Sequence, residues 1–327
     1  MKAIAVIPHW NRRDLLESLL PNLGSQTRPF EEVIVVDNGS RDGSAAYARD
    51  QGATVLELPE NMGFAPAVNR GIERALADGA AWIAILNNDV TLEPDWLALL
   101  LAAASDDPDK QVHFVTGKIL SARNPSILDG TWDEISRGGA PLRCGSGKPD
   151  GPYWNQRRRI RMTSMTAALF RADIFNQIGT LDEDFISYLE DVDFGLRCMK
   201  SGLGGVYEPA AVAYHLGSST LGQWSLDAVR KLARNQILLE KKHFKGFPRL
   251  PIVVSQLLWG LLALRHGRFG AFRAGRREAR HLASIGGEPA TKRFQEEIRE
   301  SEQTILAVQR TTGFDWFWRV YFWTLQP

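Results

Sequence analysis

The stretch that decides the fold is Ala80-Ala81-Trp82-Ile83-Ala84-Ile85-Leu86-Asn87-Asn88-Asp89-Val90. Its apolar part has the length and flanks of a buried strand, and it ends in three small polar residues before Thr91-Leu92-Glu93-Pro94, where we expect a helix to begin. Asp89 is therefore expected at the carboxyl end of a strand, where ligands bind in open α/β sheets. A carboxylate beside two amide side chains suits a hard cation that holds a diphosphate. The same residues also suit a simple turn, so both interpretations stay open here.

Strands and helices alternate through the first hundred residues. The patterns predict strands at residues 3–7, 32–36 and 54–58, and helices at 12–23, after Ser44 and at 66–77, with Asn11 as the N-cap of the first helix. Such alternation predicts an α/β fold with a Rossmann-like, mostly parallel sheet and flanking helices. A chain of 327 residues is long enough for a second domain.

Polar residues also follow the second and third predicted strands. Asp37-Asn38-Gly39-Ser40 follows the second strand and Asn61-Met62-Gly63 the third. Side chains of this kind can bind a base or ribose, and the glycine before a helix amino terminus would let a phosphate approach. Each segment taken alone is more simply a turn. Because carboxyl ends of parallel strands share one edge of a sheet, we expect Asp37, Asn61 and Asp89 to converge.

Four motifs occur in a characteristic order. They are Ile7-Pro8-His9-Trp10-Asn11-Arg12, Val35-Val36-Asp37-Asn38-Gly39-Ser40-Arg41-Asp42-Gly43-Ser44, the segment from Asn61 to Gly71, and Leu86-Asn87-Asn88-Asp89-Val90. In this succession the chain resembles family 2 glycosyltransferases with the GT-A fold, and within that family bacterial rhamnosyltransferase-like enzymes that build cell-surface polysaccharides. The resemblance covers residues 1–220, the expected nucleotide-sugar-binding and catalytic domain. It implies an inverting transfer of a sugar from a nucleoside diphosphate to a hydroxyl group.

The resemblance also implies roles for individual residues. Asp37 would contact the nucleotide base and Asn61 would help to hold the nucleotide. Asp89 matches the last acid of the Asp-x-Asp motif of the family, which binds a divalent metal, Mn²⁺ or Mg²⁺, on the diphosphate. Here Asn87 replaces the first acid, so the metal needs another ligand. The residues expected to bind the nucleotide sugar are Pro8, Asn11, Asp37, Asn38, Ser40, Asn61, Gly63, Asn69 and Asn88.

His215 is the candidate for that further metal ligand. It ends a short apolar strand that follows Tyr207-Glu208-Pro209. The resemblance implies that a histidine at this place completes the metal site, and imidazole suits Mn²⁺ better than Mg²⁺. A histidine at a strand end is otherwise a structural or hydrogen-bonding residue, and position alone favours that interpretation.

An acidic segment supplies the catalytic candidates, because six of the twelve residues from Asp182 to Asp193 are acids. Glu190 and Asp193 are three residues apart and share a helix face, whereas Asp191 projects elsewhere. Acids in the first turn of a helix also simply stabilise its dipole. The pair Glu190-Asp191 matches the Glu-Asp motif of the family. The resemblance implies that Asp191 is the general base and that Glu190 helps to orient the acceptor; Asp193 is expected to be structural.

A segment of small residues and methionines at 162–171 precedes a predicted helix at 172–178. The resemblance implies that the wall of the acceptor and donor-sugar site lies here, at Met165 and Thr166. The same residues are equally suited to a core, which is the simpler interpretation. Residues 137–161 are rich in glycine, proline and arginine and are expected to form a loop.

The composition changes after residue 220. The net charge of the whole chain is +1, but residues 230–280 contain thirteen Lys or Arg and only two acids. Residues 250–264 form an apolar run that, as a helix, is about 22 Å long and too short to span a membrane. The segment from Phe314 to Trp323 has seven aromatic residues in ten. We expect residues 221–327 to be a helical region that contacts a membrane surface or a second copy of the chain.

These features together predict the class of function, the partners and the location. The donor is expected to be a dTDP- or UDP-linked sugar, with dTDP-rhamnose first, and the acceptor a saccharide or a lipid-linked saccharide. Met1-Lys2 leads directly into a predicted strand, and Cys144 and Cys198 lack metal-ligand spacing, so a cytoplasmic protein, peripheral on the inner face of the membrane, is expected. The alternatives are a nucleotidyltransferase, which would need a glycine-rich basic loop that residues 8–20 lack, or a silent nucleotide-binding or scaffold protein. Nucleic-acid binding would leave the catalytic motifs unexplained.

Overall fold

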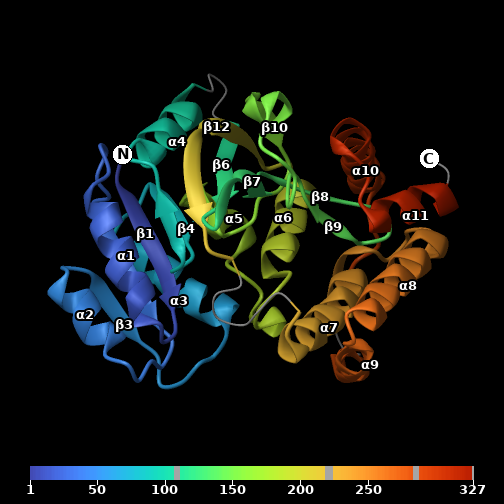
Figure 1. The fold of residues 1–327 in the computed structure, drawn as a ribbon, viewed down its shortest axis with the longest axis horizontal. Coiled ribbons are helices and arrows are strands. Elements are labelled where there is room, and N and C mark those ends of the chain that lie inside the picture. The colour runs from blue at the N-terminus through green and yellow to red at the C-terminus, as the bar shows by residue number, and fades with distance from the viewer. Residues whose placement is uncertain (107–110, 218–223, 283–286, 326–327) are drawn as a thin grey trace. The chain divides into compact units, whose positions relative to one another are not determined.

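The computed structural model describes residues 1–106, 111–217, 224–282 and 287–325 (Figure 1). The chain divides into two compact units. The first comprises Met1–Trp132 and Gly145–Thr220, and the second comprises Asp133–Cys144 and Leu221–Pro327. The boundary expected between residues 220 and 221 lies outside the described residues.

The first unit is built on a ten-stranded mixed sheet in which β10, β12, β6, β11, β4, β1, β2 and β3 follow one another, while β5 pairs with β12 and β7 with β6. Strands β1, β2, β3 and β4 are parallel; β11 is antiparallel to β4 and β6, and β12 is parallel to β6. The carboxyl ends of β1, β2, β4, β6 and β12 therefore lie at one edge. The strands are β1 (Ala3–His9), β2 (Glu32–Asp37), β3 (Thr54–Glu57), β4 (Trp82–Leu86), β5 (Val90–Leu92), β6 (Val112–Ser121), β7 (Asn124–Gly130), β10 (Arg158–Ile160), β11 (Ala167–Arg171) and β12 (Gly204–His215).

Helices cover both faces of this sheet. The helices of the first unit are α1 (Arg13–Gly24), α2 (Ser44–Asp50), α3 (Phe64–Ala77), α4 (Trp96–Ser105), α5 (Asp173–Ile178) and α6 (Glu190–Ser201), with short 3-10 turns η1 (Pro152–Asn155) and η2 (Glu183–Phe185). Apolar residues of α1 and α4 form one core with the face of β1 that carries Ala5. On the opposite face, α3 approaches so closely that a Cβ at Gly71 would lie 2.2 Å from Val6 Cγ1. The predicted α/β fold, a central sheet with flanking helices, is confirmed.

The residues after Asp89 form a strand, and the helix expected from Thr91 is wrong. Val90–Leu92 is β5, which pairs antiparallel with β12 so that Val90 lies opposite His215. Helix α4 begins only at Trp96. The β-branched side chains of Val90 and Thr91 suit an extended chain, and β12 supplies the partner that a local pattern cannot show. This pairing brings Asp89 next to His215.

The first helix is capped from another loop, so the expected N-cap at Asn11 is wrong. Asn11 and Arg12 both have positive φ angles, and α1 begins at Arg13. The Asn11 side chain accepts a hydrogen bond from the backbone nitrogen of Arg41, while the Arg13 nitrogen donates to Asp42. The loop after β2 therefore holds the turn after β1, and Asn11 belongs to that contact.

The second unit consists of a two-stranded hairpin and helices. Its elements are β8 (Asp133–Ile135), β9 (Pro141–Arg143), α7 (Leu226–His243), α8 (Arg249–Arg265), α9 (Phe269–Glu278), η3 (Ala279–Leu282), α10 (Lys292–Thr312) and α11 (Trp316–Leu325). The hairpin is tied to α10, because the Ser301 hydroxyl donates to Glu134 and Arg137 pairs with Glu302. Residues 137–161 are therefore not simply a loop, since they include β9, η1 and β10. None of the helices in the described ranges is both long and apolar enough to cross a bilayer.

Candidate active site

One edge of the large sheet gathers the polar residues. His9, Asp37 and His215 are the last residues of β1, β2 and β12, and Asn87 follows the end of β4. These four strands run in the same direction, so their carboxyl ends share an edge, as expected for a ligand site in an α/β sheet.

His215 bridges two carboxylates at this edge. Its Nε2 lies 3.1 Å from Asp89 Oδ1, and its Nδ1 lies 2.9 Å from Asp129 Oδ2. Burial alone would lower the pKa of His215, but the hydrogen bonds to Asp129 and Asp89 outweigh it and raise the pKa to about 9. Without a metal the imidazole is therefore a cation shared by the two acids.

Asp89 and His215 are of the residue types that bind divalent metals. A carboxylate on one ring nitrogen of a metal-binding histidine fixes the ring and leaves the other nitrogen for the metal, which is the relation of Asp129 to His215. Asp89 would supply the hard oxygen ligand beside it. Within the described residues, no group of three or more His, Cys, Asp or Glu side chains is arranged to hold a metal. A metal here would therefore take further ligands from substrate phosphates or water.

The loop after β2 brings together several of the expected nucleotide ligands. Asp37 is buried and its Oδ1 accepts a hydrogen bond from the Ser40 nitrogen, while Ser40 Oγ accepts one from the Asn11 nitrogen. Pro8 is opposite Val36 in the β1–β2 register, one residue before this loop. Asp37, Ser40 and Asn11 thus form one hydrogen-bonded group, and Pro8 lies on the neighbouring strand β1.

A second group joins Asn38 to the loop before α3. The Asn38 amide nitrogen donates to Asn61 Oδ1 at 3.1 Å and to the Gly63 carbonyl at 2.9 Å, and its oxygen accepts from the Met62 nitrogen. The amino terminus of α3, which we expected to favour a phosphate, is already occupied. Its Ala65 nitrogen donates to the Ile186 carbonyl and its Phe64 nitrogen to Ser187 Oγ. The expectation of a phosphate on these amides is therefore wrong.

Gly63 allows the start of α3 to approach Ile186 closely, and this gives a first prediction. Its φ is +102°, and an added Cβ would lie 2.6 Å from both the carbonyl oxygen and Cγ2 of Ile186. We expect Gly63→Ala to lower the free energy of unfolding by about 1–3 kcal/mol more than Gly79→Ala. Gly79 also has a positive φ, +75°, but open space around it, so it is the matched control. Chemical denaturation measures the free energy of unfolding of both variants. Equal decreases would mean that the close approach of Gly63 to Ile186 does not contribute to stability.

The acidic segment reaches the site through a strained turn. Ile186, Tyr188 and Leu189 have positive φ angles, immediately before α6 begins at Glu190. Such conformations persist where the surroundings impose them, and here Ile186 and Ser187 are held by α3. The turn therefore ties the segment just before the acids of α6 to the start of α3.

The acids of α6 differ in their surroundings. Glu190 is buried, whereas Asp191 is half-buried and its Oδ1 accepts a hydrogen bond from the Val192 nitrogen. Asp193 is fully buried and pairs with Arg197 at 2.9 Å, and the Arg197 guanidinium also donates to backbone carbonyls of residues 178–180. Asp193 therefore holds the segment before the acids, as expected of a structural residue.

Asn88 is held by His9 at the end of β1. Asn88 Nδ2 lies 2.9 Å from His9 Nδ1, and His9 Nε2 lies 2.9 Å from Ser44 Oγ. Burial lowers the pKa of His9 to about 4, so the ring is neutral. If the amide donates to Nδ1, the ring proton is on Nε2 and points to Ser44. A buried histidine thus joins the loops after β1, β2 and β4.

Three other expected site residues have mainly internal contacts. The Asn69 amide donates to the Leu181 carbonyl and accepts from the Leu181 nitrogen, so it fastens α3 to the acidic segment. Met165 is buried. The Thr166 carbonyl accepts a hydrogen bond from the Asn87 nitrogen, which places the 162–166 segment against the end of β4.

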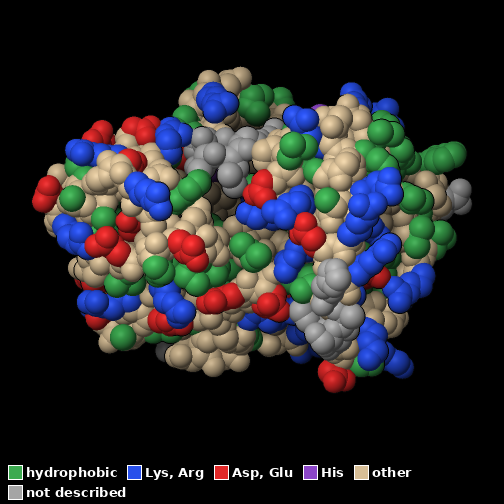
Figure 2. Space-filling model, turned by 90° about the horizontal axis from the view of Figure 1, so that it is seen from below, with side chains coloured by type: hydrophobic (Ala, Val, Ile, Leu, Met, Phe, Trp, Pro, Cys, Tyr) green, Lys and Arg blue, Asp and Glu red, His purple; other side chains and the backbone are tan. Residues whose placement is uncertain are grey.

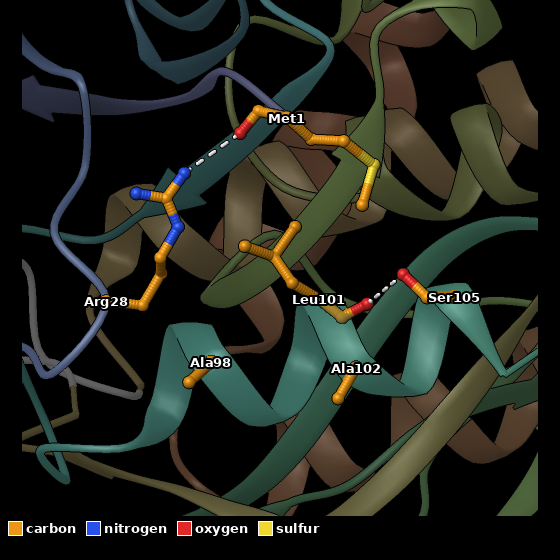
Figure 3. Close-up of a pocket in the computed structure, with 6 residues that line it drawn as sticks. All are labelled: Met1, Arg28, Ala98, Leu101, Ala102 and Ser105. Atoms are coloured by element: carbon orange, nitrogen blue, oxygen red, sulfur yellow. Dashed lines mark hydrogen bonds between the residues drawn. The ribbon is translucent and has the colours of Figure 1, made fainter.

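A surface pocket lies at the other edge of the sheet and takes no part in this site. It has a volume of about 300 Å³ and is lined by Met1, Arg28, Ala98, Leu101, Ala102 and Ser105 (Figure 3). Met1 precedes β1 and Ser105 ends α4, so the pocket is at the amino ends of the parallel strands. Its lining has a single charged side chain and no carboxylate.

The sequence patterns missed four residues that contribute to the site. Asp129 lies in Leu128-Asp129-Gly130, which reads as a turn, and only the pairing of β6 with β7 brings it to His215. His9 lies in the motif Ile7-Pro8-His9-Trp10-Asn11-Arg12, but the sequence predicted no role for it. Ile186 and Ser187 could have been suspected only from their position before the Glu-Asp pair.

The comparisons with solved structures identify the fold. A crystal structure of GalNAc-T7 with UDP, GalNAc and Mn²⁺ matches with a TM-score of 0.66 at 14% identity, covering 93% of this chain and 57% of that one. A mannosyltransferase from Pyrobaculum calidifontis in complex with GDP-Man and Mn²⁺ matches with a TM-score of 0.53 at 17% identity, covering 94% and 86%. The chain thus has the GT-A fold of these structures.

Sequence comparison then gives the family. Residues 4–179 match the model described as glycosyl transferase family 2. An N-acetylglucosaminyl-diphospho-decaprenol L-rhamnosyltransferase of Mycobacterium tuberculosis is 32% identical over 286 residues, covering 76% of this chain and 87% of that protein. A poly-beta-1,6-N-acetyl-D-glucosamine synthase of Staphylococcus aureus is 24% identical, covering 78% of this chain and 61% of that protein. The chain belongs to glycosyl transferase family 2 and is a glycosyltransferase.

Proposed function

We propose that this chain transfers L-rhamnose from a dTDP- or UDP-linked donor to a hydroxyl of a lipid-linked saccharide, with inversion at the anomeric carbon. The sugar and the acceptor class are suggested by the name of the mycobacterial relative. The observation that supports the chemistry most is the Asp89–His215–Asp129 array at the edge where β1, β2 and β4 also end. The residues that we propose to hold the diphosphate and the nucleotide base lie at this edge of the sheet.

Asp89 and His215 are the proposed metal ligands, and Asp129 orients the imidazole. A divalent cation bound there, Mn²⁺ or Mg²⁺, would offset the negative charge that develops on the departing nucleoside diphosphate. For His215 to act as a ligand, the proton on Nε2 must leave. Asp37, Ser40 and Asn11 are proposed to surround the base and ribose, with Asn38, Asn61 and Asn88 on the side nearer the diphosphate.

Asp191 is the proposed general base and Glu190 an orienting neighbour. Asp191 is half-buried at the first turn of α6, so part of its side chain is exposed to solvent, as a proposed base for an entering acceptor requires. It would take the proton of the acceptor hydroxyl as the new carbon–oxygen bond forms and the bond to the diphosphate breaks. This direct displacement inverts the anomeric carbon and needs no covalent enzyme intermediate.

A lipid-linked acceptor also implies a location. The hydroxyl that accepts the sugar would stay close to the membrane that holds its lipid. We therefore propose that the chain is peripheral on the inner face of the cell membrane.

Thermal unfolding with nucleotides tests the donor site. We expect one of dTDP, UDP and GDP to stabilise the chain when Mn²⁺ is present and much less when it is absent. A nucleotide at one hundred times its dissociation constant adds about 2.7 kcal/mol to the free energy of unfolding. Stabilisation by dTDP or UDP would support the proposed donors, whereas a preference for GDP would contradict them. No response to any nucleotide with metal would contradict the proposed site.

A further inference from the structure

Helix α8 carries a row of exposed apolar side chains. Leu250, Val253, Leu257, Leu261 and Leu264 are 49% to 63% exposed, although they are large and apolar. We call these five residues the α8 ridge. Their spacing of three and four residues puts them on one face of the helix, over about 21 Å of its length. Contiguous exposed apolar surface of this kind marks an interaction site more often than chance.

The other faces of α8 are packed within the second unit. Leu258 belongs to a core formed with α10 and α11, and Ala263 belongs to one formed with α7 and α9. The ridge is therefore a different face of α8 from those buried in these cores. It is the one side of α8 that the unit does not cover in the described part of the chain.

A basic residue lies at each end of the ridge, and the neighbouring segments of the second unit are rich in basic residues. Arg249 and Arg265 are the end residues of α8, which contains no acid. The only acids from residue 230 to 280 are Glu240, which pairs with Arg249, and Glu278, which pairs with Arg230. Other exposed basic residues of this segment are Lys245, Arg273, Arg277 and Arg280. Figure 2 shows Lys and Arg side chains gathered with hydrophobic ones over the C-terminal helices.

Helix α11 adds aromatic side chains to the same unit. It packs on α8 through Trp318, Tyr321 and Phe322, while Trp316 and Trp323 are exposed. Tryptophan side chains favour the boundary between lipid headgroups and acyl chains, because the ring is apolar and its N–H is polar.

We propose that the α8 ridge docks on the surface of an anionic lipid bilayer, with its leucines in the upper acyl region and its arginines among the phosphates. An apolar face bordered by basic residues is the pattern of helices that lie in the membrane interface. A second copy of the chain suits the ridge less well. Antiparallel helices would place Arg249 of each against Arg265 of the other, and parallel helices would align like residues, with no acid on α8 to pair with either.

Vesicle binding tests this surface separately from donor binding. The full chain should sediment with vesicles of phosphatidylglycerol and phosphatidylcholine, and much less with phosphatidylcholine alone. Raising the salt from about 0.1 M to about 1 M shortens the screening length from about 10 Å to about 3 Å, so binding should weaken. In Leu257→Gln/Leu261→Gln we expect binding to fall at least about tenfold, because two leucines no longer enter the lipid.

Leu226→Gln is the matched control, because Leu226 is 60% exposed but lies at the start of α7, outside the ridge. It should bind vesicles like the wild type, and all variants should unfold at the same temperature, since the changed residues are exposed. Failure of the wild-type chain to bind anionic vesicles would overturn the proposal, as would full binding by the double variant. A dimer in light scattering that the double variant converts to a monomer, without vesicle binding, would assign the ridge to a second copy instead.

Discussion

Replacing Asp191 with Asn should lower the rate of sugar transfer by about 10²–10⁴-fold, the usual contribution of a general base. The amide has nearly the shape of the carboxylate, and its oxygen can still accept the hydrogen bond that the Val192 nitrogen gives to Asp191. The first turn of α6 should therefore keep its structure. What is lost is the ability to take a proton from the acceptor hydroxyl. The measurement is transfer from dTDP-rhamnose to a lipid-linked saccharide.

Two companion measurements separate this role from a structural one. Asp191→Asn should retain the metal-dependent stabilisation by the nucleotide, because Asp191, the proposed general base, is not part of the proposed donor site. Asp184→Asn makes the same charge change at an exposed acid seven residues earlier and should transfer at the wild-type rate. Equal loss in both variants would point to the charge of the segment and not to Asp191. Nucleotide binding without transfer in the wild type would favour a silent nucleotide-binding protein.

The strands could be predicted because their signals are local. Ala3–His9, Glu32–Asp37 and Trp82–Leu86 are apolar runs that end in polar residues, and the structure has them within two residues of the predicted bounds. Position at the carboxyl end of a strand was enough to bring Asp37 and His215 to one edge of the sheet.

The predictions that were wrong or missing concern contacts between residues that are distant in the sequence. β5 has only three residues, and it is a strand because β12, more than a hundred residues later, pairs with it. The amides at the start of α3 are occupied by Ile186 and Ser187, which belong to a turn that no local pattern predicts. Asp129 is likewise next to His215 only through the β6–β7 pairing. Sequence patterns predict which residues end strands, but not which loops close over them.

Replacing Asp89 with Ala should abolish the Mn²⁺-dependent part of nucleotide binding. Asp89 is the oxygen ligand of the proposed pair, and its carboxylate lies against His215 Nε2. At one hundred times the dissociation constant, the loss would be nearly all of the about 2.7 kcal/mol of stabilisation expected for the wild type. Thermal unfolding with nucleotide, at increasing Mn²⁺, measures it. An Asp89→Ala chain that keeps the metal dependence would contradict the site.

Asp129→Asn should weaken Mn²⁺ binding at the same site without abolishing it. The amide oxygen can still accept a hydrogen bond from His215 Nδ1, so the ring keeps its place, but the negative charge that makes Nε2 a better donor to a metal is gone. We expect Mn²⁺ affinity to fall by about 10–100-fold, the usual effect of losing such a partner. Asp173→Asn, which removes an acid that pairs with Arg171 at the end of β11, is the matched control. Wild-type affinity in Asp129→Asn would mean that Asp129 only fills space beside the histidine.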